Sequence, residues 1–301
     1  MTRGTADILL LLAALIWGLA FVGQATAMAH VGPFTFIGAR FLLASLAVLP
    51  FALREAAAAP EIPARRRLGL LGIGVVFFLA ASLQQIALLS TSVTNAGFLT
   101  AIYVVLVPAI GALALRHRLP GAIWPAALLS LAGTFLLGGG RIDGLNSGDW
   151  LVIAGAVFWA VQILALGRLA FDLRRPFATA LGQFAIAALL GLTLGLAFEN
   201  PSLAGLAAAW REIAYTGIVS GGLAFTLQSI AQGHTPPADS AILLSMESLF
   251  AALFGALLLG ERLDLLGWIG GGFVLAAAII VQVGPLLAAR YRTNPLGSGP
   301  K

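Results

Sequence analysis

The chain has 301 residues, of which 60% are hydrophobic and only 10% are charged, and its net charge is +5. A soluble globular domain is about 45–50% apolar and about 25% charged, so this composition excludes a water-soluble protein and indicates that lipid surrounds much of the chain. The absence of cysteine excludes a disulfide framework and any thiol chemistry.

Apolar runs follow one another along the whole chain. A transmembrane helix needs about 20 mostly apolar residues. Ten runs reach this length, at residues 6–26, 33–54, 68–89, 93–115, 121–140, 148–170, 177–198, 210–232, 236–258 and 264–287. None alternates with a period of two residues, which argues against a β-barrel. The sequence therefore predicts an all-α membrane protein with ten transmembrane helices.

The first run also has features of a cleaved signal peptide. Arg3 precedes the apolar stretch, and Ala25-Thr26-Ala27 resembles a cleavage site. The segment has an internal counterpart, described below, so we expect it to be retained as a helix.

Basic residues occupy mainly alternate links between the runs. If the N terminus is cytoplasmic, 13 arginine and lysine residues lie in inner segments and three in outer ones, while Arg40 lies inside a run. The inner residues are Arg3, Arg54, Arg65, Arg66, Arg67, Arg116, Arg118, Arg168, Arg174, Arg175, Arg290, Arg292 and Lys301, and the outer residues are Arg141, Arg211 and Arg262. This bias predicts that both termini are cytoplasmic. It is typical of membrane topology, so no nucleic-acid partner is expected.

The two halves of the chain resemble each other. LQQIA at 83–87 aligns with LQSIA at 227–231, and GALALRHRL at 111–119 aligns with GALLLGERL at 255–263. The aligned pairs are Asp7/Asp149, Trp17/Trp159, Gln84/Gln228, Thr91/Thr235, Gly111/Gly255 and Arg118/Arg262. Chance similarity between apolar helices is the alternative, but the shared register and the matched turns favour a true repeat.

Each half contains five runs, so the second half must enter the bilayer from the opposite face. Inverted repeats of this kind are common in secondary transporters. We expect one five-helix repeat at 1–144, a second, inverted repeat at 145–290 around a central cavity, and a disordered cytoplasmic tail at 291–301.

Several of these features together resemble the EamA type of the drug/metabolite transporter superfamily. They are Trp17-Gly18 in the first run, Arg40 in the second, LGERL at 259–263 and the two five-helix repeats. The resemblance covers about residues 5–287. It implies a secondary carrier of small organic metabolites in a bacterial-type inner membrane that works without ATP. Size and aromatic content look most like the exporters of aromatic and other neutral amino acids.

Few residues other than aliphatic ones lie near the middle of a run. Trp17, Tyr103, Trp159 and Glu247 do, and repeat symmetry pairs Trp17 with Trp159 and Tyr103 with Glu247. Inverted-repeat carriers bind substrate near the midplane, so we predict that these four residues bind substrate, together with Phe21 and Gln162. Aromatic walls suit an apolar or aromatic substrate. Helix packing is the alternative role for the two tryptophans.

Three further polar residues are candidates for the path or its gates. Gln84 and Gln228 are expected on opposite rims of the path, or else bonded between helices. Arg40 must pair, meet water, or snorkel toward the surface. It could pair with Glu247, close a gate or attract a substrate carboxylate. Glu247 itself could bind an ammonium group, carry a coupling proton, or remain protonated and bonded to a neighbouring helix.

Small residues and prolines add expectations about packing. Gly191/Gly195, Gly217/Gly221 and Gly267/Gly271 have the spacing that permits close approach of helices. Pro108 removes a backbone donor, so a kink is expected there.

Other functional classes find little support in the sequence. The histidines lack metal-ligand spacing, and the hydrolase, zinc-protease and P-loop motifs are absent. We therefore expect no metal, no cofactor and no enzyme activity. Phosphorylated substrates would need more cations than Arg40. Export of lipophilic cations is the main alternative, and a channel is a remote one.

The expected partners are a small-molecule substrate and the lipid bilayer, with the protein a monomer or weak dimer.

Overall fold

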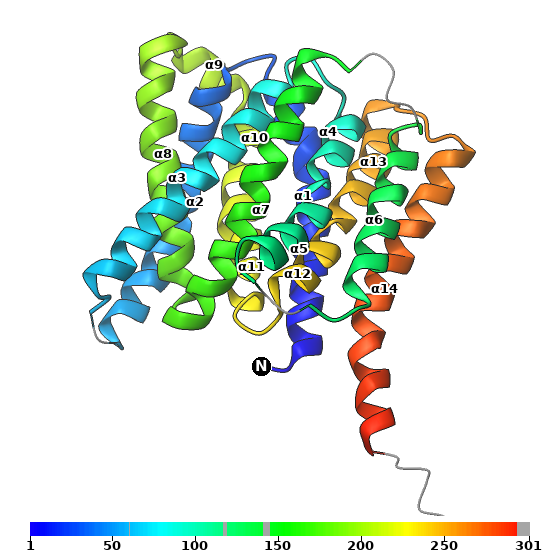
Figure 1. Ribbon diagram of the computed structural model, residues 1–301. Helices are drawn as coiled ribbons and strands as arrows, with labels where there is room; N and C mark the ends of the chain where they lie inside the picture. Colours follow the sequence, from blue (N-terminus) through cyan, green and yellow to red (C-terminus); the bar gives the residue numbers. More distant parts are fainter. Residues whose placement is uncertain (60, 117–118, 141–144, 294–301) are drawn as a thin grey trace, which may run out of the picture.

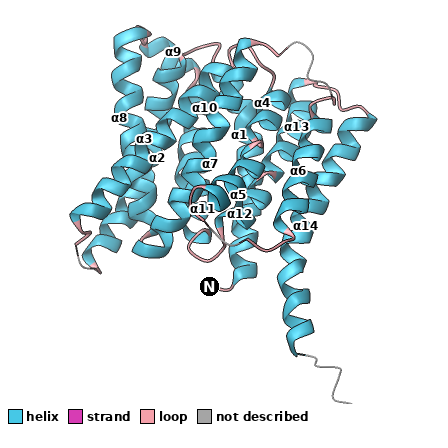
Figure 2. Cartoon of the chain, in the orientation of Figure 1, coloured by secondary structure: helices cyan, strands magenta, loops and turns pink. Residues whose placement is uncertain are grey.

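The computed structural model describes the chain except residues 60, 117–118, 141–144 and 294–301, and it describes no side chains in 284–293. Helices make up every regular element of the described residues (Figures 1 and 2). In order they are α1 Arg3–Ala27, α2 Pro33–Ala57, α3 Ala64–Ala87, α4 Val93–Thr100, α5 Tyr103–Leu113, α6 Ile123–Leu137, α7 Ser147–Leu173, α8 Pro176–Phe198, α9 Leu203–Ala208, α10 Trp210–Ala214, the π-helix η1 Tyr215–Phe225, α11 Thr226–Ala231, α12 Pro237–Leu244, α13 Met246–Leu259 and α14 Leu265–Thr293.

The predicted all-helical membrane fold is confirmed. In the described part of the chain, nine helical segments are long and apolar enough to cross a bilayer. The remaining predicted run forms α6, whose 15 residues span less than the hydrocarbon core of about 30 Å. The last helix continues past the expected end at 287 to Thr293, so the first residues of the predicted tail 291–301 are helical. The rest of that tail lies outside the described residues.

Two spans are interrupted at matching places. The break between α4 and α5 is at Ala101, and that between α12 and α13 is at Ser245, its partner in the repeat register. At each break an amide bonds three residues back, as Val104 N does to Ala101 O (2.9 Å) and Ser248 N to Ser245 O (3.1 Å). Such tightened turns often mark functional hinges. Pro108 lies inside α5, seven residues after the break at Ala101, so the break itself is not at the proline.

Helices α2 and α8 cap each other. The Glu199 carboxylate accepts hydrogen bonds from Phe34 N (2.8 Å) and Thr35 N (2.7 Å) at the start of α2. Glu55, in the last turn of α2, accepts one from Ala178 N (2.8 Å) at the start of α8. The first amides of a helix lack helical partners, and its dipole favours an anion there. The two antiparallel helices thus stabilise each other at both ends.

A second reciprocal contact joins the two halves of the chain. The Thr91 hydroxyl donates to Asp149, and the Thr235 hydroxyl donates to Asp7 Oδ1 (3.0 Å). These four residues are two of the pairs aligned by the repeat register. Thr235 lies at the end of the bundle that holds the N terminus, which we call the N side, and Thr91 lies at the opposite end, the far side.

The expected close approach of helices occurs at most of the spaced glycines. A Cβ at Gly191 would lie 2.6 Å from Gly38 N, and one at Gly217 would lie 2.7 Å from Arg40 O. On α14 the tightest contact differs from the expected pair. It is at Gly270, where a Cβ would lie 2.4 Å from Gly133 O of α6.

Substitution of Gly191 by leucine is expected to destabilise the protein by about 1–3 kcal/mol, because the new side chain would force α2 and α8 apart. The matched control is Gly72→Leu on α3, where a Cβ meets no atom within 4 Å. Thermal loss of the monodisperse peak in detergent measures the effect. Equal melting of the two variants would contradict this packing.

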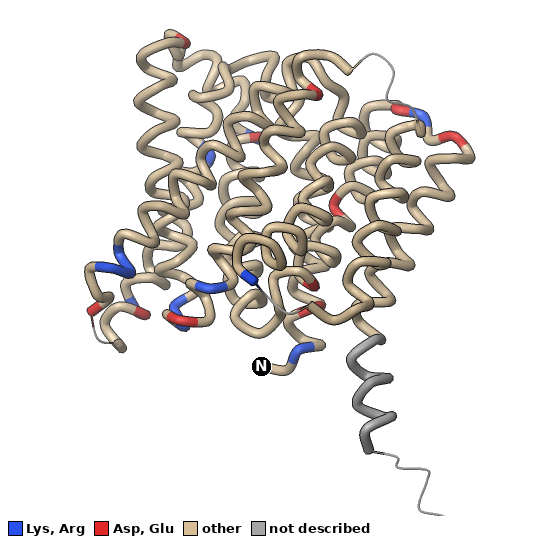
Figure 3. Tube along the Cα trace, viewed as in Figure 1, with Lys and Arg blue, Asp and Glu red and all other residues tan. Residues whose placement is uncertain are grey.

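Charge is distributed unevenly over the bundle. The arginines gather on the N side (Figure 3). In the described side chains, that side holds Arg3, Arg54, Arg65, Arg66, Arg67, Arg116, Arg168, Arg174 and Arg175, while Arg211 and Arg262 lie on the far side. Arg118, Arg141 and Lys301, counted in the sequence, lie outside the described residues, as do the side chains of Arg290 and Arg292.

Candidate functional site

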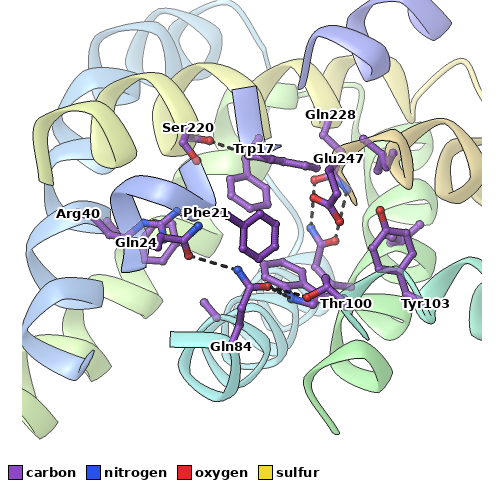
Figure 4. Close-up of a pocket in the computed structure, with 17 residues that line it drawn as sticks. Trp17, Phe21, Gln24, Arg40, Gln84, Thr100, Tyr103, Ser220, Gln228 and Glu247 are labelled. Atoms are coloured by element: carbon purple, nitrogen blue, oxygen red, sulfur yellow. Dashed lines mark hydrogen bonds between the residues drawn. The ribbon is translucent and has the colours of Figure 1, made fainter. Parts of the chain in front are cut away.

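The structure brings every sequence-predicted site residue to one central cavity. Its lining includes Trp17, Phe21, Arg40, Gln84, Tyr103, Trp159, Gln162, Gln228 and Glu247 (Figure 4). These side chains come from α1, α2, α3, α5, α7, α11 and α13. Both halves of the chain therefore contribute to one site.

Aromatic rings form the walls of this cavity. Phe225 lies between the two tryptophans, with ring centroids 4.4 Å from Trp17 and 5.9 Å from Trp159. The Trp17 Nε1–H donates to Ser220 O (3.2 Å), and the Trp159 Nε1–H donates to Gln84 Oε1 (3.0 Å). With their polar atoms bonded, the indoles present apolar faces, as stacking on a flat substrate requires.

Glutamine side chains form two hydrogen-bonded groups at the cavity. Gln84 donates to Gln24 Oε1 (3.2 Å) and also accepts from Thr100 Oγ1 (3.5 Å). Gln162 donates to Gln183 Oε1 (2.8 Å), and Gln228 donates to Gln162 Oε1 (3.4 Å). Gln84 and Gln228 were expected on opposite rims of the path. The structure places both at this cavity but in separate hydrogen-bonded groups, and each bonds to a glutamine of another helix, which was the alternative role.

The cavity is lined by one arginine and one glutamate that do not pair with each other. Arg40 is 4% exposed, so it does not snorkel to the surface, which was one of the alternatives for this residue. Its Cζ lies 4.6 Å from the ring centroid of Phe41, a cation–π contact that holds the guanidinium inside. Glu247 is 5% exposed, and the Tyr103 hydroxyl lies beside its carboxylate without a hydrogen bond of normal geometry. Within the described residues, no salt bridge includes Arg40 or Glu247.

The lining residues that the sequence analysis did not nominate include Thr100, Ser220 and Phe225. Phe225 lies three positions before Gln228, so helical spacing could have placed both on one face. Ser220 has no such signal, because serine is ordinary in an apolar helix and its position depends on the π-helix η1.

The cavities of the bundle differ in volume from one depth to another. The central cavity has a volume of about 40 Å³, room for a few waters at about 10–15 Å³ each, whereas ligand pockets usually have about 300–1,000 Å³. On the N side a second cavity of about 820 Å³ lies beside α7 and the link between α11 and α12. On the far side, apolar side chains that include Phe21, Leu88 and Val93 pack together. This conformation is therefore closed around the site and filled on the far side.

Comparison with known proteins agrees with this architecture. The EamA-like transporter family matches the chain twice, at residues 4–139 and 146–283. Two proteins of Archaeoglobus fulgidus, both described as uncharacterized transporters, are similar to the chain. One is 31% identical over 281 residues, covering 92% of this chain and 86% of its own length, and the other is 26% identical, covering 91% and 96%.

A solved crystal structure shares the fold. It superposes with a TM-score of 0.77 at 22% identity, covering 96% of this chain and 99% of its own. Together with the matches along both halves of the sequence, this places the chain among multi-pass membrane transporters of small substrates. The chain belongs to the EamA-like transporter family.

Proposed function

We propose that the chain exports small organic metabolites, foremost aromatic and other neutral amino acids, through the plasma membrane. The observation that carries this proposal is the central cavity, which is lined both by Trp17, Trp159 and Phe225 and by the carboxyl group of Glu247. Aromatic faces favour an apolar or aromatic side chain, and a buried carboxylate favours an ammonium group.

Transport by this proposal follows alternating access of two inverted repeats, 1–144 and 145–290. The reciprocal contacts Thr91–Asp149 and Thr235–Asp7 support that division. The arginine bias supports a cytoplasmic N side. Substrate enters from the N-side cavity, the site closes around it, and the packed far-side cluster separates to release it.

Counterflow in proteoliposomes tests the proposal. Labelled phenylalanine moves down its gradient with or without unlabelled phenylalanine on the opposite face. Saturable flux that is accelerated by counter-substrate is expected. Flux that neither saturates nor accelerates would indicate a channel. Failure to exceed empty liposomes, in protein shown to be monodisperse, would overturn the amino-acid assignment.

Export of lipophilic cations is the second candidate, because Glu247 and the tryptophan faces also suit such compounds. Arg40 weighs against it, since a buried guanidinium in the same cavity repels a substrate whose only charge is positive. Inhibition of phenylalanine counterflow by a quaternary ammonium dye separates the two. A dye that is itself transported and inhibits better than phenylalanine would favour the second candidate.

Trp17→Ala, which removes the indole ring, is expected to lower phenylalanine counterflow about tenfold or more. This is the effect of losing roughly 1.4 kcal/mol of binding free energy. Trp17→Phe should retain most of the flux, because it keeps a ring against Phe225. Trp268→Ala is the control, since Trp268 is 59% exposed on α14. If Trp17→Ala and Trp268→Ala transport equally, Trp17 does not contact the substrate.

A further inference from the structure

Among the described side chains, seven buried polar atoms make no hydrogen bond of normal geometry, and three of these line the central cavity: Arg40 Nε, Ser220 Oγ and Tyr103 Oη, which lies beside the Glu247 carboxyl group. Arg40, Ser220 and Tyr103 are 4%, 0% and 3% exposed. Buried polar groups are nearly always bonded. A polar ligand bound in this cavity would complete the bonding of these three atoms.

Ser220 differs from the other hydroxyls of its span. Thr216 Oγ1 donates to Glu212 O (2.6 Å), Thr226 Oγ1 to Gly222 O (2.6 Å) and Ser229 Oγ to Phe225 O (2.9 Å), each one turn back along the helix. Ser220 makes no such bond and lines the cavity. It lies in the π-helix η1, whereas the matching part of the first repeat is regular α-helix in α3. π-helical turns occur frequently at functional sites.

The side chains with unpartnered atoms lie at two ends of the cavity. Helix η1 packs on α2 at Arg40, since a Cβ at Gly217 would lie 2.7 Å from Arg40 O. Arg40 and Ser220 thus come from adjacent elements. Tyr103 and Glu247 lie beside each other at the two helix breaks. Figure 4 shows the first pair on one side of Trp17 and Phe21 and the second pair on the other.

Each end matches a different charge. A guanidinium and a hydroxyl donate to a carboxylate, and a carboxylate with a phenolic oxygen accepts from an ammonium group. A guanidinium and a carboxyl group buried without charged partners are costly to hold inside a bundle. A substrate with a single charge would satisfy one end only and leave the other unpaired, whereas a substrate with both charges satisfies the two ends together.

We infer that the cavity selects zwitterions, with Arg40 and Ser220 receiving the substrate carboxylate while Glu247 and Tyr103 receive its ammonium group. This inference rests on the proposed function and deepens it, since it makes the pair of charges, rather than the aromatic side chain, the main determinant of selectivity.

A competition experiment with three related compounds tests the inference. Phenylalanine, phenethylamine and 3-phenylpropionate have similar aromatic bodies and differ in charge. Each is used to inhibit counterflow of labelled phenylalanine and, separately, to stabilise the purified protein against heat. Both compounds with a single charge are expected to need at least about tenfold higher concentrations than phenylalanine.

Ser220→Ala assigns the carboxylate end. It should raise the concentrations needed for phenylalanine and 3-phenylpropionate about tenfold and leave phenethylamine unchanged, because only the first two carry a carboxylate. Ser229→Ala is the matched control, since Ser229 is a buried serine of the same span whose hydroxyl is already bonded. A uniform change for all three compounds would overturn the role of Ser220.

The two readouts separate failure of the inference from failure of the proposed function. Phenylalanine transport with equal inhibition by the singly charged compounds would overturn the inference alone. Preferential stabilisation by phenylalanine without transport would overturn amino-acid export and keep the zwitterion site. Neither transport nor preferential stabilisation would overturn both.

Discussion

Glu247→Gln is expected to reduce phenylalanine counterflow at least about 30-fold, the equivalent of losing roughly 2 kcal/mol of binding. The carboxylate is 5% exposed and lies in the closed cavity. Glutamine keeps the size of the side chain but removes the negative charge that an ammonium group requires. Because this exchange leaves packing almost unchanged, a loss of flux would reflect chemistry rather than misfolding.

Two roles of Glu247 give different results in two assays. Counterflow between equal pH values needs no coupling ion, whereas uptake driven by a pH gradient does. If Glu247 only carries a coupling proton, Glu247→Gln keeps counterflow and loses pH-driven uptake. If it binds the ammonium group, both are lost, which is the expected result. Full pH-driven transport by Glu247→Gln would exclude a role in proton coupling.

Controls for this substitution come from the same chain. Glu61→Gln alters an exposed carboxylate that pairs with Arg67 outside the spans and should leave both assays unchanged. Tyr103→Phe removes the hydroxyl next to Glu247 and should cause a smaller loss than Glu247→Gln, because a neutral group contributes less than a charge to binding an ammonium. Equal flux in all three variants would place the ammonium site elsewhere.

Sequence reasoning succeeded where a single physical requirement dominates. Length and hydropathy dictate the spans, because a bilayer requires about 20 apolar residues for each helix. Sequence reasoning was less informative about where a helix is interrupted inside a span. Ala101 and Ser245 interrupt their helices without a proline or glycine, while Pro108 lies in an intact helix. Such breaks depend on tertiary packing, which local propensity does not report.

Some residues of the site could likewise be predicted from the sequence, and others could not. Depth in the span and repeat symmetry were enough to nominate Trp17, Tyr103, Trp159 and Glu247, and the structure places all four at one cavity. Ser220 could not be found in this way. Its exposure to the cavity follows from η1, whose widened turn accompanies tight packing of Gly217 and Gly221 on α2, and no local pattern in the sequence predicts that turn.

The orientation of the bundle predicts an all-or-none labelling result. The natural chain has no cysteine, so single-cysteine variants have no background. Ala58→Cys lies just after α2 on the N side, and Ala208→Cys lies at the end of α9 on the far side, and both positions are exposed. A membrane-impermeant maleimide applied to intact cells is expected to label Ala208→Cys fully and to spare Ala58→Cys.

The physical reason for this expectation is the arginine bias, because positively charged links near span ends are retained in the cytoplasm. Permeabilised cells are the control, since both variants should then react and thereby show that each thiol is accessible. Labelling of Ala58→Cys alone in intact cells would invert the bundle. The N-side cavity of about 820 Å³ would then face outward, and loading from outside would turn the proposed exporter into an importer. The direction of transport therefore depends on this orientation as much as on the chemistry of the cavity.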